Sequence, residues 1–216
     1  MKQSNPIAVL TGDLVNSRRA DKGAVGITFD ALRAATDDFG QAHQLDLRFT
    51  RFRGDGWQAV LTRPNTILEA TLFILARLKA TPNSLATRIG IGIGPSTSLG
   101  TSDLADADGP AFITSGRLLD SMSPKRRLTI AGQGIGQNQT AILDLTEFIT
   151  AGWTTTQAQA MAHALRNYPR TQDDIASELG ITRQAVQSRL AGAGLAYFET
   201  SIGAFRHHSF KTPPQD

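Results

Sequence analysis

Two aspartates occupy positions from which their carboxylates can act together. Asp13 follows a short apolar segment, residues 7–10, and Asp55 lies at the centre of a Gly-Asp-Gly tip between two apolar segments. If the first strand of a sheet lies beside that hairpin, the two acids meet at one edge of the sheet. Paired carboxylates suit Mg²⁺ or Mn²⁺ whose coordination is completed by substrate phosphates. The alternative, equally open, is that each acid caps its own turn.

A second set of polar residues, within residues 171–190, indicates nucleic-acid binding. Thr171 and Thr182 are good helix N-caps, and Gly180 between them supplies the left-handed residue of a tight turn. Long amide and guanidinium side chains on one helix face are groups that contact base edges and phosphates. The pattern predicts a helix-turn-helix DNA-binding unit, and the alternative is a helical hairpin for protein contacts. The residues predicted to face outward on its second helix are Arg183, Gln184, Gln187, Ser188 and Arg189.

Composition limits the remaining chemistry. The chain has 216 residues and no cysteine, which removes disulfides and thiolate metal sites and fits a reducing, cytoplasmic setting. No apolar run is long enough to span a membrane, and the beginning of the chain lacks a secretory signal pattern. The formal net charge is only +3, so any contact with DNA depends on a local cluster rather than on bulk charge.

The order of expected elements predicts an α+β fold. Leucine and phenylalanine at helical spacing, and alternation in the strands, give a βαββαβ pattern of the ferredoxin-like or palm type, which we expect to form an antiparallel sheet with helices on one face. Glycine alternates with isoleucine in residues 87–94, which indicates close packing against a strand backbone. The expected strands are residues 7–10, 45–52, 57–61, 87–94 and 127–130, and the expected helices are residues 24–43, 67–78 and 112–122.

These elements predict two domains. Residues 1–132 form the α/β domain, and residues 133–153, which begin with a Gly-, Gln- and Asn-rich stretch, form a linker and a connecting helix. Residues 154–210 form a small all-α (winged) helix-turn-helix domain. That domain carries few charges in excess, so one copy is expected to bind DNA weakly and a homodimer is the expected remedy.

Four segments resemble the SatD family. They are LTGDLVNSR at residues 10–18, RGDGWQ at residues 53–58, RIGIGIG at residues 88–94 and DGPAFITSGR at residues 108–117. A C-terminal helix-turn-helix also matches the layout of that family, so the resemblance extends over nearly the whole chain. It implies a domain organisation rather than an activity.

More distantly, the N-terminal part is similar to class III nucleotidyl cyclases and related palm domains. That resemblance implies a metal pair on Asp13 and Asp55. It also puts Arg51 and Asp106 at the positions of the two base-selecting residues. Arg117 matches an arginine that stabilises the transition state, but Ile113 stands where those enzymes have an asparagine. Loss of one polar orienting group commonly costs about two to three orders of magnitude in rate. The cyclase sites form between subunits, so Arg117 is expected to act across a dimer.

Three functions follow as hypotheses. The first is a DNA-binding regulator whose cyclase-like domain binds a nucleotide or phosphate ligand with metal, with Arg18 as a phosphate contact. The second is an active nucleotidyl cyclase or related phosphoryl-transfer enzyme that carries a C-terminal helix-turn-helix. The third is a dimerisation scaffold without a ligand. Pyrophosphate release from a nucleoside triphosphate separates the first two.

Overall fold

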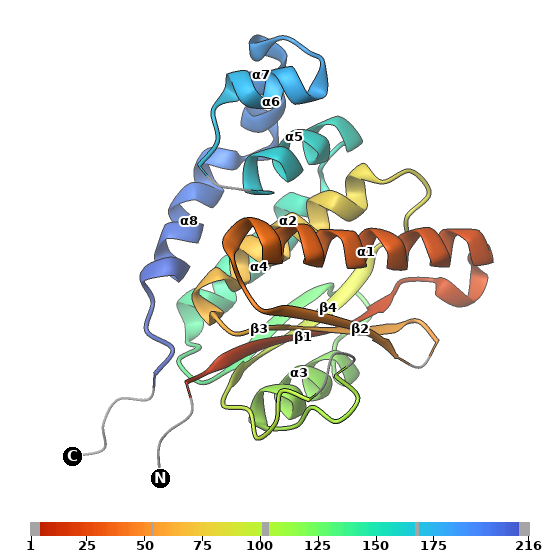
Figure 1. Cartoon of the computed structure of the whole chain (residues 1–216), viewed down its shortest axis with the longest axis vertical. Helices are drawn as coiled ribbons and strands as arrows, with labels where there is room; N and C mark the ends of the chain where they lie inside the picture. The colour runs from red at the N-terminus through yellow and green to blue at the C-terminus, as the bar shows by residue number, and fades with distance from the viewer. Residues whose placement is uncertain (1–4, 53, 101–103, 167–168, 212–216) are drawn as a thin grey trace.

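The computed structural model describes residues 5–52, 54–100, 104–166 and 169–211. Strands and helices alternate along the chain as far as β5, and the five strands form one sheet. Only helices, α4 to α8, follow β5 in the described residues (Figure 1). The elements in order are β1 (Ile7–Leu14), η1 (Ser17–Arg19), α1 (Lys22–His43), β2 (Leu47–Phe52), β3 (Gly56–Leu61), η2 (Pro64–Thr66), α2 (Ile67–Ala80), β4 (Thr87–Gly94), α3 (Pro110–Asp120), β5 (Leu128–Gly132), α4 (Gln137–Ala151), α5 (Thr155–Arg166), α6 (Gln172–Leu179), α7 (Arg183–Ala193) and α8 (Leu195–His207).

The strand order is β2-β3-β1-β4-β5. The first four strands pair antiparallel, which is the order that a βαββαβ chain adopts and confirms that part of the prediction. The sheet as a whole is mixed, because β5 joins the edge of β4 in parallel. The expectation of a purely antiparallel sheet is therefore wrong at this edge, where α3 provides the crossover that a parallel pair requires.

Helices cover both faces of the sheet. Helices α1 and α2 lie on one face, and α3 lies on the other, below the sheet in the view of Figure 1. The prediction of helices on one face is thus corrected. The strand periodicity explains the arrangement, because alternate residues of β4 point to opposite faces. Ile89, Ile91 and Ile93 join the core beneath α1 and α2, while the glycines between them face α3.

The glycines of β4 allow α3 to lie against the strand backbone. A Cβ atom placed on Gly92 would come within 2.2 Å of the Ala111 carbonyl oxygen, and one on Gly90 within 2.6 Å of the Ser115 carbonyl oxygen. No side chain fits at either position without moving a helix backbone. The close packing predicted from the alternating glycines is therefore confirmed, and it fixes α3 over β4 and β1.

Helix α2 is buried nearly all round. Ten of its 14 residues are buried, including Glu69 and Thr71. A helix with this pattern needs cover on several sides: α1 lies beside it and α5 packs along it. The hydrophobic core consequently continues from the sheet through α2 into the C-terminal helices, as far as Phe210.

The C-terminal helices have the caps that the sequence predicts. Thr171 accepts from the Asp174 backbone N–H, and Thr182 from the Ala185 backbone N–H, each at 3.2 Å. Gly180 adopts φ 63°, so α6 and α7 are joined by a tight turn. The part of the chain described after Gly132 contains no strand, so the wing considered for this domain is not found there. None of the described helices has the length and apolar character needed to cross a bilayer.

The segment after α8 is tied to the α/β part. The Asn65 side-chain amide in η2 donates to the carbonyl oxygens of Arg206 and His208 at 3.1 and 2.7 Å. Trp153, between α4 and α5, donates from its indole N–H to the Ala193 carbonyl at the end of α7, at 2.9 Å. These contacts join the two predicted domains to each other and to the segment between them. The boundary between the domains at residues 133–153 therefore stays a prediction.

Candidate functional site

Asp13 and Asp55 lie at the same end of the sheet. Asp13 pairs in register with Gly56 of β3, the residue directly after Asp55. The Leu14 backbone N–H donates to the Asp55 carbonyl oxygen at 3.2 Å, which fixes the hairpin tip beside the end of β1. The expected meeting of the two acids at one edge follows from this pairing. Both side chains are half-buried.

Arg88 of β4 is the immediate partner of Asp13. The two residues are opposite each other in the β1–β4 ladder, and both guanidinium nitrogens Nε and Nη2 donate to the carboxylate, Nε to Oδ1 at 2.8 Å. The Asp13 carboxylate raises the pKa of Arg88, first through the hydrogen bond and then through its charge, and the charge of Asp55 adds to the effect. Arg88 therefore lies near both acids. No role was predicted for it, because only the β1–β4 register brings it there.

Asp55 is held from the other side by the loop after β1. The Ser17 hydroxyl of η1 donates to its Oδ2. Arg18 and Arg19 follow, both exposed, and neither guanidinium has a hydrogen bond or ion pair to a described residue. The loop thus places two exposed arginines directly after Ser17, the residue that contacts Asp55. This is the placement expected of Arg18 as a phosphate contact, and that role stays a prediction.

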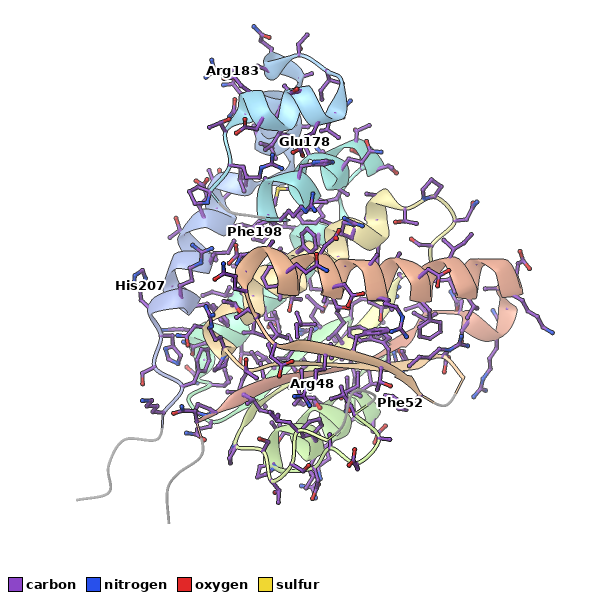
Figure 2. The ribbon with its side chains drawn as sticks, in the orientation of Figure 1. Arg48, Phe52, Glu178, Arg183, Phe198 and His207 are labelled. Atoms are coloured by element: carbon purple, nitrogen blue, oxygen red, sulfur yellow. The ribbon has the colours of Figure 1, made fainter. Side chains whose placement is uncertain are left out.

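A line of polar side chains continues from Asp13 along the α3 face of the sheet. The Thr11 and Ser115 hydroxyls are 2.7 Å apart and buried, and the Gln58 amide donates to Thr11 at 3.1 Å. Arg48 of β2 lies on the same side and donates to the Leu99 and Gly100 carbonyls (Figure 2). Sequence patterns did not single out these residues, because a polar residue in a strand is also the ordinary sign of an exposed face.

The two base-selecting positions are not brought together within one chain. Arg51 donates to the Gly54 carbonyl and stacks over the Phe29 ring of α1, with 4.0 Å from its guanidinium carbon to the ring centroid. Asp106 is exposed and lies beside Gly100, in the segment that Arg48 contacts from the α3 side. Arg51 and Asp106 are therefore on opposite faces of the sheet. A shared contact with one base would need a second copy or a rearrangement.

Arg117 lies one turn beyond Ile113 on the outer surface of α3. Both are exposed, and Ile113 keeps 48% of its surface accessible. The Arg117 guanidinium has no hydrogen bond or ion pair to a described residue. An exposed isoleucine beside an unpartnered arginine is compatible with the expectation that this face meets another subunit, which stays a prediction.

The five residues predicted to face outward on α7 lie on an open surface. Arg183, Gln184, Gln187 and Ser188 are exposed and Arg189 is partly exposed, while Val186 and Leu190 on the opposite face are buried. Arg183 lies at the end of the molecule farthest from the sheet (Figure 2). Its closest acid is Asp173, at 3.9 Å between Nε and Oδ1, with both side chains largely in solvent.

Within the described ranges, no three His, Asp or Glu side chains form a group arranged for a metal ion. Among the residues that the structure describes, the acidic end offers the carboxylates of Asp13 and Asp55. Mg²⁺ is commonly held by one or two carboxylates plus substrate phosphates, so this donor set fits a shared metal–phosphate site rather than an all-protein one.

Comparison with protein families gives one match over most of the chain. The model of the SatD family matches residues 7–205. That range includes the sheet, the acidic end, α6, α7 and most of α8. A comparison with curated proteins found no significant match.

Several solved structures are similar at low identity. One is the catalytic core of a rhodopsin-guanylyl cyclase with converted specificity, in complex with ATPαS, at 22% identity and a TM-score of 0.42 over 56% of this chain and 75% of that chain. A second is the guanylate cyclase domain from Catenaria anguillulae in complex with GTP, at 20% identity and a TM-score of 0.42 over 57% of this chain and 76% of that chain. A third is a bacterial light-regulated adenylyl cyclase, at 19% identity and a TM-score of 0.43 over 69% of this chain and 81% of that chain. Because the scores and identities are low, they establish no activity for this chain.

Proposed function

The chain belongs to the SatD family, and we propose that its α/β part binds a nucleoside triphosphate or related phosphate ligand with Mg²⁺ or Mn²⁺ at the acidic end of the sheet. The register that places Asp13 opposite Gly56 carries the proposal, because it puts Asp55, the residue before Gly56 at the hairpin tip, beside the end of β1. Two carboxylates at one strand end are the donors that a hard divalent ion takes when phosphates complete its shell.

The ion pair with Arg88 is compatible with this role. An ionised carboxylate has about four lone-pair sites, and the two hydrogen bonds from Arg88 use two of them. Without Arg18 and Arg19, whose charges would face the phosphates, the two carboxylates and the Arg88 guanidinium together carry a net negative charge that attracts a cation. A metal ion bound here would neutralise phosphate oxygens. Arg88 and Ser17 would hold the two carboxylates in place, and Arg18 and Arg19 would contact the phosphates.

Phosphoryl transfer, including nucleotide cyclisation, is the second form of this proposal. The paired acids and the exposed Arg117 support it. Ile113 in the position of an orienting amide, and the separation of Arg51 from Asp106, favour slow turnover or binding alone within a single chain. Measuring binding and turnover on the same samples decides between the two forms.

The test uses the full chain with ATP or GTP and Mg²⁺ or Mn²⁺. We expect the nucleotide to raise the melting temperature only when metal is present, because a ligand that binds the native state stabilises it by mass action. Asp55→Asn should abolish that shift. Asp30→Asn, an exposed acid on α1, is the matched control and should keep it. Pyrophosphate release that Asp55→Asn abolishes establishes an enzyme. If no combination of nucleotide and metal shifts the melting temperature of the unaltered protein, the result favours a dimerisation scaffold without a ligand.

The exposed polar face of α7 favours a second activity, contact with DNA. Thr182 and Gly180 fix how α7 leaves α6, and buried Val186 holds it against α5 and α6, so its outer face is rigid. Arg183 and Gln187 on that face have the chemistry that binds phosphates and base edges. Together with the proposed ligand site, this makes the protein a ligand-responsive DNA-binding regulator that acts as a homodimer.

Fluorescence anisotropy with DNA fragments from upstream of the gene for this chain tests the second activity. Arg183→Ala and Gln187→Ala should each weaken binding by about 1 to 3 kcal/mol if they read bases. Lys22→Ala removes an exposed charge from the first residue of α1, outside α6 and α7, and should change little. If both α7 variants bind as tightly as the unaltered protein, or if the unaltered protein binds no fragment, α6 and α7 serve protein contacts instead.

A further inference from the structure

A cavity of about 490 Å³ lies where the sheet meets the helices that lead to α6 and α7. Its walls come from the end of α2, the segment that leads into β4, the start of β5, the end of α4 and the start of α5. Thr87 is among its lining residues and points to the face opposite α3, so the cavity is separated by the sheet from the Asp13 carboxylate. Ligand cavities commonly measure about 300 to 1,000 Å³.

The charged groups at this cavity leave an excess of positive charge. Lys79, Arg127 and Glu147 line it. Glu147 is already engaged, since it accepts from Arg126 Nε at 3.1 Å and from the Leu128 backbone N–H at 2.9 Å. Neither Lys79 nor Arg127 forms an ion pair with a described residue.

Arg127 also has an unsatisfied nitrogen. Its Nη1 is buried and has no hydrogen-bond partner among the described residues. An unpaired buried charged donor is costly, and a rotation of the Arg127 side chain that turned Nη1 toward the acceptor of a ligand in the cavity would relieve that cost. The arginine is therefore the part of the cavity that favours an anion over a neutral molecule.

The rest of the wall is apolar or carries hydroxyl groups. Leu75 and Leu78 come from α2 and Leu128 from β5, with Thr150 and Thr155 on the side of α4 and α5. We propose that the cavity binds a small organic anion, a carboxylate or phosphate on an apolar body, with the anionic group at Arg127 and the apolar body against the leucines.

Such a ligand would contact both the sheet and the α4–α5 junction. Thr87 lines the cavity, and its hydroxyl donates to the Asp13 backbone carbonyl at 2.7 Å. Thr155 opens α5, which packs on α2 and on α7. The site is distinct from the acidic end, so its test is independent of the metal and nucleotide proposal.

The experiment uses the anionic fluorophore 8-anilinonaphthalene-1-sulfonate on the folded full chain, with sodium octanoate and 1-octanol as competitors. We expect fluorophore binding that octanoate displaces more effectively than octanol. Arg127→Gln should weaken octanoate competition by about tenfold or more, the factor that the loss of a charge-assisted hydrogen bond produces. It should leave octanol competition within about twofold, because hydrophobic burial does not depend on that charge.

Lys125→Gln is the matched control, because it removes the same charge from an exposed residue that does not line the cavity. It should behave as the unaltered protein. Ala86→Trp, at an exposed lining position, should fill the cavity and block the binding of the fluorophore and of both competitors. It provides the test if circular dichroism shows that Arg127→Gln does not fold. Equal octanoate competition in the Arg127→Gln and unaltered proteins overturns the proposal, as does unchanged binding in Ala86→Trp.

Discussion

Arg206 of α8 clamps the buried carboxylate of Glu69 on α2. Its Nη2 donates to Oε1 and Oε2 at 2.8 and 2.7 Å, and Glu69 is only 1% exposed. His43 lies 3.9 Å from the same carboxylate. One ion pair therefore connects the last helix of the chain to the central helix of the α/β part.

Removing the arginine should destabilise the whole protein. Arg206→Met leaves Glu69 buried without its main partner, and breaking a buried pair in this way costs about 3 kcal/mol or more. Urea denaturation measures the loss. The double variant Arg206→Met with Glu69→Met should recover much of it, because no buried charge then remains. A single variant as stable as the unaltered protein would show that the pair contributes nothing.

The contact of α3 with β4 predicts the effect of one methyl group. Gly92→Ala places a Cβ 2.2 Å from the Ala111 carbonyl oxygen and 2.7 Å from the Ser115 backbone nitrogen, so α3 must shift. Overpacking of this kind costs about 1 to 3 kcal/mol or more. Gly116→Ala is the control on α3, where nothing lies within 4 Å, and helix propensity should make it stabilising by about 1 kcal/mol. Thermal unfolding of both variants measures the contrast, and equal melting temperatures would contradict it.

The ion pairs of Glu178 on α6 make the stability of the protein depend on pH in the acid range. Hydrogen bonds from Arg170 and then His163 lower the pKa of Glu178 to about 2 from its ordinary 4.5. A lowered carboxyl pKa stabilises the fold fully above the unfolded value and loses that contribution as the pH falls through the folded value. The contribution is therefore complete above about pH 5 and disappears toward pH 2. The side chain is 39% exposed, so solvent screening keeps it modest.

Melting temperatures of the unaltered protein and of Glu178→Gln, measured from pH 7 to pH 2, check this response. The variant should be less stable at pH 7, and the two curves should converge as the pH falls. Glu199→Gln, an exposed position on α8, serves as the control and should follow the unaltered protein at every pH. A gap between the curves that stays constant down to pH 2 would place the stabilisation elsewhere.

Arg88 sets the charge of the acidic end. Arg88→Gln removes the only guanidinium that is bonded to Asp13 among the described residues. If Asp13 and Asp55 hold a divalent ion, its affinity should rise by roughly tenfold, because a nearby unit charge is worth about 1 to 4 kcal/mol at 4 Å near a protein surface. Isothermal titration with Mn²⁺ measures the change, and Lys125→Gln controls for net charge. Weaker Mn²⁺ binding would contradict this prediction and show that the positioning of the Asp13 carboxylate by Arg88 outweighs the effect of its charge.

Local patterns were sufficient for much of the fold. The alternation of glycine and isoleucine located β4 to the residue, and Thr171, Gly180 and Thr182 fixed the ends of α6 and α7. Each of these signals depends on neighbours within a few residues, so the sequence carries it directly; the far end of α7, at Ala193 before Gly194, was not predicted. The expected juxtaposition of Asp13 and Asp55 needed only the pairing of β1 with the hairpin.

What required the structure was the pairing of distant segments. Whether Arg51 and Asp106 share a face depends on strand parity and on which face α3 covers, and neither is encoded locally. The partnership of Arg88 with Asp13 depends in the same way on the β1–β4 register. A shift of one residue in either strand would have turned these side chains to the opposite face.

The continuous core from the sheet to Phe210 limits how this chain can be divided. Because α5 covers α2 and Trp153 caps the end of α7, truncation near residue 153 would strip the apolar flank of α2 and leave it open to water. A fragment that stops there is expected to aggregate rather than to report on the α/β part alone. Gene fragments for biochemical work should therefore extend through Phe210.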